Sequence, residues 1–149
     1  MINKISFLIF CVLLITSCGS EESFEEQLIG TWTGNLLQVD CCTFDIEVTI
    51  TSLAIGQNIA SGRFFNCNAE ICNNDLFFCD EIRNNPLACS FSWRLDALLD
   101  PSLTVFEEAS GDCASGTVTV TLQENGALQY LFVDIDNPDN RTSGELTKS

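Results

Sequence analysis

Alternation between apolar and polar residues is the feature that most restricts how this chain can fold. It is clearest at residues 44–51, 90–96, 117–123 and 128–132. A repeat of two puts every second side chain on the same side of the backbone, which is typical of a strand with one buried face. Weaker segments of the same kind span Leu28–Val39, Ile59–Phe65, Leu103–Ala109 and Arg141–Thr147. The pattern predicts an all-β protein of about eight strands, with no convincing helix after residue 27.

Short turns join most of these strands. Asn125-Gly126 is suited to a two-residue type I′ turn, and residues 56–58 and 100–101 have turn composition. Eight sequential antiparallel strands can hide their edges by closing into an up-and-down barrel, which is the fold we predict. A sandwich is the alternative, but it would need a long crossover. Only residues 66–88, a long Asn- and Cys-rich loop between strands three and four, could supply one.

The apolar positions of the strands give the expected barrel interior. They are Trp32, Leu36, Phe44, Ile46, Val48, Ile50, Phe91, Trp93, Leu95, Val118, Val120, Leu122, Leu128, Tyr130 and Phe132. An eight-stranded barrel is just wide enough to be filled by side chains or to hold one small ligand. In a barrel with a cavity the ligand should be apolar and mostly neutral, because no strand clearly places an arginine inside; Arg63 is the sole candidate, and the pattern leaves open which face it lies on. The cavity would then be lined by Phe91, Trp93, Tyr130 and Phe132.

The N-terminal residues have the features of a secretory signal peptide. Lys4 precedes the apolar run 5–15, and small residues follow up to Cys18. As a helix the run reaches roughly 16 Å, too short for a hydrocarbon core of about 30 Å. The segment resembles a bacterial lipoprotein signal, whose lipobox ends in a cysteine. The resemblance implies that residues 1–17 are removed and that acyl chains on Cys18 anchor the protein to a membrane.

Glutamates dominate residues 18–27, which we interpret as an acidic tether ahead of a barrel domain at 28–149. Small and acidic residues directly after the lipidated cysteine resemble an export tag of one Gram-negative lineage. That resemblance implies the cell surface, rather than a periplasm-facing position, on the outer membrane. The formal net charge of −15 should repel nucleic acid and anionic head groups. We therefore expect no nucleic-acid partner.

Cysteine usage agrees with export. Cys11 would leave with the signal peptide and Cys18 would carry the lipid. The other cysteines are Cys41, Cys42, Cys67, Cys72, Cys79, Cys89 and Cys113. Outside the cytosol they should pair, and their odd number predicts up to three disulfides and one leftover thiol. A zinc site is the rival interpretation, but the chain has no histidine. We expect disulfides to bind the long loop to its neighbours.

Gly30-Thr31-Trp32, on the first strand after an acidic segment, resembles the Gly-x-Trp signature of lipocalin-like barrels. The order of strands behind it, to about Lys148, is similar to the same meander. The resemblance implies that Trp32 plugs the closed end of the barrel and that a basic residue, here Lys148, packs over it. Avidin-like barrels also begin with Gly-Thr-Trp. A C-terminal helix and the Thr-Asp-Tyr motif of core lipocalins are missing from the sequence.

The connections of a meander alternate between the two ends of the barrel. All the cysteines after Cys18 then fall at one end, while tight turns and the entry of the first strand lie at the other, closed end. The lipid would sit at the closed end. The cysteine-rich rim would point away from the membrane.

Metal binding and catalysis have little support in the sequence. Asp134, Asp136 and Asp139 have a spacing that calcium loops favour, but the glycine and distal glutamate of such loops are missing. An ordinary Asn/Asp/Pro turn is the favoured interpretation. Without histidine no Ser-His or Cys-His nucleophile can form, and a strand points Glu107 and Glu108 to opposite faces. We expect neither an enzyme nor a cofactor.

The sequence thus predicts a lipid-anchored, non-catalytic protein of the cell envelope that binds or carries a small apolar ligand inside a lipocalin-like barrel. The alternative is a protein-binding module, such as an inhibitor or adhesive surface protein. That module would act through the disulfide-stapled acidic rim and have a filled core.

Overall fold

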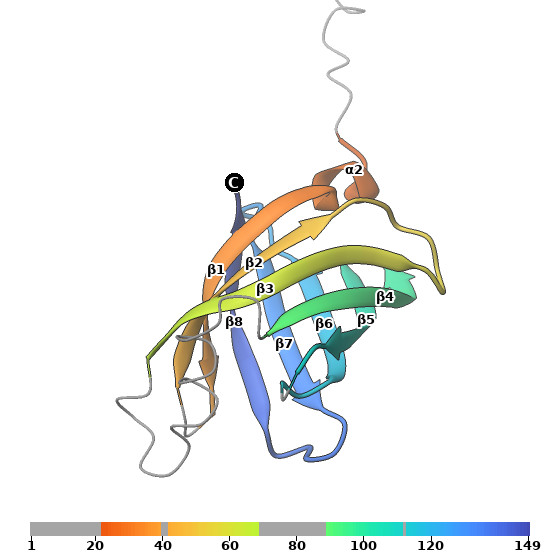
Figure 1. The fold of residues 1–149 in the computed structure, drawn as a ribbon. Coiled ribbons are helices and arrows are strands. Elements are labelled where there is room, and N and C mark those ends of the chain that lie inside the picture. Colours follow the sequence, from red (N-terminus) through yellow and green to blue (C-terminus); the bar gives the residue numbers. More distant parts are fainter. Residues whose placement is uncertain (1–21, 40–41, 69–88, 112) are drawn as a thin grey trace, which may run out of the picture.

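Eight antiparallel strands follow one another around a closed barrel (Figure 1). The computed structural model describes residues 22–39, 42–68, 89–111 and 113–149. The elements are α2 (Phe24–Leu28), β1 (Gly30–Gln38), β2 (Thr43–Ile50), β3 (Asn58–Asn68), β4 (Ser90–Leu99), β5 (Ser102–Ala109), β6 (Gly116–Leu122), β7 (Leu128–Asp134) and β8 (Arg141–Lys148). Each strand pairs with the next, and β8 pairs with β1. The predicted up-and-down barrel is confirmed, and the sandwich is not formed.

The alternation in the sequence corresponds to the two faces of the barrel wall. Every apolar position expected in the interior belongs to the core or, for Leu122, packs against it. Arg63, whose face the sequence left open, lies on the outer face, where its Nη2 is 3.2 Å from Oε1 of Glu47. Its strand places Phe64 inside, so Arg63, the preceding residue, must point outward.

The turn between β6 and β7 differs from the prediction. A two-residue type I′ turn would need positive φ at both Asn125 and Gly126, but only Gly126 adopts it, with φ 81°. The last hydrogen bond between β6 and β7 instead forms one residue further from the turn, where the Gln123 N–H donates to the Ala127 carbonyl at 2.8 Å. The result is a three-residue loop, which is the arrangement of a type I turn followed by a left-handed glycine.

A short helix, α2, forms at the end of the acidic tether predicted for residues 18–27. Ser23 Oγ accepts from the Glu26 N–H, and the Glu26 carboxylate accepts from the Ser23 N–H at 3.0 Å. This reciprocal capping box satisfies two N–H groups at the start of α2. The prediction of no helix concerned the chain beyond this tether, and the Ser-x-x-Glu spacing of Ser23 and Glu26 is the sequence signal for α2.

α2 closes one end of the barrel. Leu28 is fully buried, and its carbonyl accepts a hydrogen bond of 2.9 Å from Trp32 Nε1. Lys148 Nζ lies 5.6 Å from the centre of the Trp32 ring and donates to the Gln27 carbonyl at 3.0 Å. Trp32 and Lys148 are also cross-strand partners. α2 and β8 therefore meet over the same tryptophan, and the C-terminus lies near α2 (Figure 1).

Glycines allow the first and last strands to approach closely. Gly34 pairs with Leu146, and Gly144 pairs with Leu36. A Cβ at Gly144 would overlap the carbonyl oxygen of Asn35 on β1 and contact the Leu36 side chain. The contact between β1 and β8, here called the closing seam, thus depends on positions without a side chain.

The described cysteines gather at the end opposite α2. Cys42 precedes β2, Cys67 is the next-to-last residue of β3, Cys89 precedes β4 and Cys113 lies between β5 and β6. Other predictions fall outside the described residues: the signal peptide, Cys18, Cys41, Cys72 and Cys79. No helix in the described part of the chain is long and apolar enough to span a membrane.

Candidate functional site

Aromatic side chains occupy the barrel interior in contact with one another. The ring centres of Phe64 lie 5.2 Å from Phe44 and 4.7 Å from Phe91. The series continues from Phe91 to Trp93 at 5.9 Å and from Trp93 to Tyr130 at 6.2 Å, both stacked. Since β4 and β7 are not neighbours in the sheet, the last contact spans the interior. Three of the candidate cavity residues are therefore packed together.

Interior glycines make room for these rings. A Cβ at Gly62 would collide with the Phe91 ring, and one at Gly116 would meet the Phe132 ring at 2.7 Å. Gly62 and Phe91 are cross-strand partners on β3 and β4. Large rings thus fill the space above small neighbours, as in well-packed cores. Two of the candidate cavity residues, Phe91 and Phe132, therefore pack closely against glycines of neighbouring strands.

Glu107 is a carboxylate inside this aromatic core. It is 1 % exposed, and its Oε2 accepts hydrogen bonds from Trp93 Nε1 at 2.8 Å and from the Tyr130 hydroxyl at 3.1 Å. Its cross-strand partners are Trp93 and Gly116. Strands β4, β5 and β7 are joined through this one oxygen, which links opposite walls of the barrel.

The environment of Glu107 changes its acidity. Burial raises the pKa of Glu107 from 4.5 to about 7, although the hydrogen bonds from Trp93 and Tyr130 act in the opposite direction. Burial also raises the pKa of Tyr130 well above its usual value, and the charge and hydrogen bond of Glu107 add to that effect. The interior position of Glu107 was not predicted, although Leu103 and Val105 set the alternation that places it there.

A disulfide ties two connections together at the end opposite α2. Cys89, at the start of β4, is bonded to Cys113, between β5 and β6. Beside it, Ser90 Oγ and Ser110 Oγ are 2.9 Å apart. Cys67 is also disulfide-bonded, and Cys42 is buried with its Sγ 3.5 Å from Gln38 Oε1. A disulfide and hydrogen bonds therefore connect this rim of the barrel to its wall.

Hydrogen bonds to the Asp134 carboxylate hold the aspartate-rich connection between β7 and β8 in place. Asp134 Oδ1 accepts from the N–H groups of Asp136 at 2.8 Å and Asn137 at 3.3 Å, and its Oδ2 accepts from Asn140 Nδ2 at 3.0 Å. Donors occupy both oxygens of the first calcium candidate, as in an Asx turn. Within the described ranges, no three Cys, Asp or Glu side chains are grouped to hold a metal ion.

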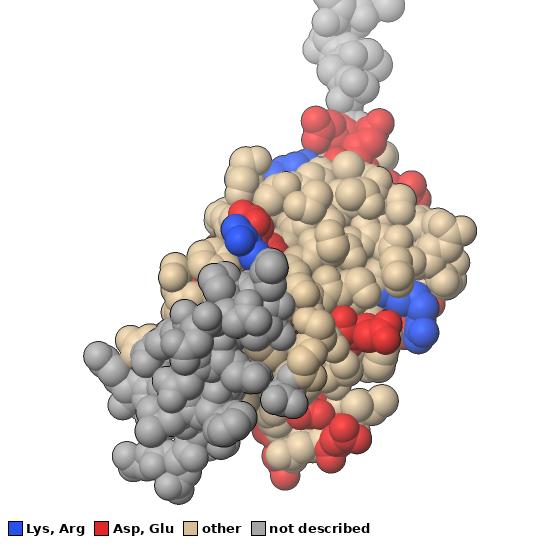
Figure 2. Space-filling model, viewed as in Figure 1, with Lys and Arg blue, Asp and Glu red and all other residues tan. Residues whose placement is uncertain are grey.

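An open groove of about 740 Å³ lies on the outer wall of β2–β5. Its outward-facing residues are Glu47, Thr49, Ser61, Arg63, Ser90, Ser92, Glu108 and Ser110, and we call it the hydroxyl groove. The lining is completed by Gly62, Phe91 and Ala109, which occupy interior-facing positions. β3 and β4 lie at the front of Figure 1, and the part of the same face that is not grey in Figure 2 is mostly tan, with red and blue side chains at its margins.

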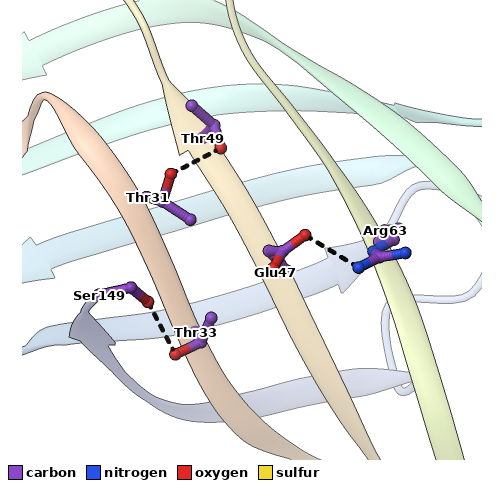
Figure 3. A network of polar contacts seen from close by, with 6 residues as sticks. All are labelled: Thr31, Thr33, Glu47, Thr49, Arg63 and Ser149. Atoms are coloured by element: carbon purple, nitrogen blue, oxygen red, sulfur yellow. Dashed lines mark hydrogen bonds and ion pairs between the residues drawn. The ribbon is translucent and has the colours of Figure 1, made fainter.

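The strand register arranges this groove in two rows. One row runs across the strands through Thr49, Ser61, Ser92 and Glu108. The other runs through Glu47, Arg63 and Ser90 and is extended by the Ser90–Ser110 hydrogen bond. Figure 3 shows the β1 side of these rows, where Thr31 Oγ1 is 3.0 Å from Thr49 Oγ1 and Glu47 is paired with Arg63.

Comparison with known proteins adds no family to this description. No protein-family model matches the chain, and no curated protein matches it in sequence.

Proposed function

We propose that this protein is a non-catalytic binding protein of the cell envelope, anchored by lipid on Cys18, that holds its partner on the outside of a filled, lipocalin-like barrel. The contact between the Trp93 and Tyr130 rings, with Glu107 hydrogen-bonded to both, is the observation that carries this proposal. A ligand at the centre of the barrel would have to break two buried hydrogen bonds to a carboxylate, and each is costly to lose.

A small apolar ligand remains the second candidate because of one feature. Phe44, Phe64, Phe91 and Phe132 form a layer towards the end opposite α2, and their exposure of 3–6 % exceeds that of Trp93 at 0 %. An apolar molecule could bind there by displacing the phenylalanine rings rather than by entering an open cavity.

Dye binding distinguishes the two candidates. We expect the intact protein to give no saturable fluorescence increase with ANS, because aromatic side chains fill its interior. Phe132→Ala should bind the dye, because it removes a ring that lies over Gly116. Phe132→Leu, which keeps most of the volume, is the matched control. Saturable binding by the unmodified protein that palmitate displaces would favour the apolar ligand and overturn the exterior site.

Lipid anchoring is tested separately at Cys18. The mature chain should incorporate radiolabelled palmitate and sediment with membranes, and surface proteolysis of intact cells should remove it. Cys18→Ser should lose the label and the membrane association, because a serine cannot form the thioether. Cys11→Ser is the control, since the predicted cleavage removes that residue. Labelling that persists in Cys18→Ser would exclude this anchor.

A further inference from the structure

The hydroxyl groove combines features that select one kind of ligand. Serine and threonine hydroxyls both donate and accept hydrogen bonds, the Glu108 carboxylate accepts, and the Arg63 guanidinium offers a planar set of donors. Glu47 and Arg63 form a 3.2 Å ion pair with side chains 40 % and 45 % exposed, so both can still reach a ligand. Such a lining suits a neutral molecule that is itself rich in hydroxyl groups.

We propose that the hydroxyl groove binds a neutral glycan chain laid across strands β2–β5. This inference rests on the proposed exterior binding function and names the chemistry of its ligand. Neighbouring strands are about 4.8 Å apart, so the row from Thr49 to Glu108 offers a polar group at regular steps of roughly that length. A linear chain of sugar rings presents hydroxyls repeatedly along its length and can use each step.

Other ligand classes fit this groove poorly. A peptide strand cannot add to the sheet, because β1–β8 close on themselves and leave no free edge. Protein partners usually insert aromatic or aliphatic anchors into apolar pockets, and the outward side chains here are Ser, Thr, Glu and Arg. Phosphate-rich ligands would meet Glu47 and Glu108 in a chain of net charge −15.

The groove is also built on a rigid part of the molecule. Its floor residues Ser61 and Ser92 are cross-strand partners. Their strand neighbours Ala60 and Phe91 are buried in the core. At one end the Ser90–Ser110 contact lies beside the Cys89–Cys113 disulfide. Groups held in this way lose little conformational freedom when a ligand binds, which favours a weak polar interaction of this type.

Calorimetric titration of the full-length protein in a zwitterionic detergent tests the inference. The probes are cellohexaose, maltohexaose and laminarihexaose, three neutral hexasaccharides of different linkage. We expect at least one to bind with a millimolar or tighter dissociation constant. Ser61→Phe, which fills the exposed floor, should weaken it at least about tenfold, and Arg63→Gln should weaken it about threefold. Thr119→Phe, on the outer face of β6, is the matched control and should bind normally.

Three results would overturn the inference. One is no heat with any of the three probes at millimolar concentration. Another is binding that Ser61→Phe and Arg63→Gln leave unchanged while near-ultraviolet circular dichroism shows both variants folded. The last is specific cross-linking of an envelope protein to a photoreactive side chain at position 61. None of these affects the proposed exterior binding in general, which fails instead if the barrel takes up ANS and releases it to palmitate.

Discussion

At pH 8, the Glu107→Gln variant should be more stable than the unmodified protein by an amount on the order of 3 kcal/mol. This figure follows from the pKa of Glu107, which rises from 4.5 to about 7 on folding. The folded protein binds the Glu107 proton more tightly than the unfolded chain does. The stability from this group is therefore fully present below pH 4.5 and is lost as the pH rises to about 7. Glutamine stays neutral throughout and can accept the same bonds from Trp93 and Tyr130.

Glu108→Gln is the matched control, because Glu108 is the exposed neighbour on the outer face. Urea unfolding from pH 4 to pH 8 should show the two variants with similar stability at pH 4. The difference between them should grow up to about pH 7 and then stay constant. A Glu107→Gln variant that is less stable than the Glu108→Gln variant at pH 8 would show that the ionised carboxylate holds the interior together.

Gly144→Ala should reduce the free energy of unfolding by about 3 kcal/mol or more. Alanine normally stabilises a strand relative to glycine by roughly 0.5–1 kcal/mol. Here the added methyl group would overlap the carbonyl oxygen of Asn35, and that oxygen belongs to the partner strand. β1 could move away only by disturbing its pairing with β8.

Ser143→Ala gives the comparison for that variant, because Ser143 is the half-exposed preceding residue on the outer face. It should change stability by no more than about 0.5 kcal/mol. Both variants can be measured by urea unfolding followed by tryptophan fluorescence, since Trp32 lies on the neighbouring strand. Equal stability of the two would mean that the seam can widen at little cost.

The fold was predictable because the alternation that marks each strand lies within one short segment of the sequence. Alternation along single segments located the eight strands that the structure describes, and uninterrupted meander order then favoured the barrel. The type of the Asn125-Gly126 turn was not predictable in the same way, because the ladder around Gln123 and Ala127 decides the loop length. The helix at Phe24–Leu28 had a readable signal in Ser23 and Glu26.

The candidate sites depend on information that a single segment does not contain. Glu107 could have been assigned to the interior by extending the alternation, but its partners Trp93 and Tyr130 come from strands on either side of it in the sequence. The hydroxyl groove exists only because the register aligns Thr49, Ser61 and Ser92 on separate strands. Pairing register follows from packing and turn geometry, so scattered serines gave no sequence signal.

The closing seam has a consequence for how this protein must be made. β8 supplies the partners of both β7 and β1, so the wall cannot be completed before residues 141–148 are available. A chain that crosses a membrane unfolded would have to be translocated as far as β8 before the barrel can close. Pairing the two terminal strands is the most distant contact in the sequence and carries the largest loop-closure entropy. Assembly would then end at the α2 end of the barrel, where the last strand returns to pair with β1.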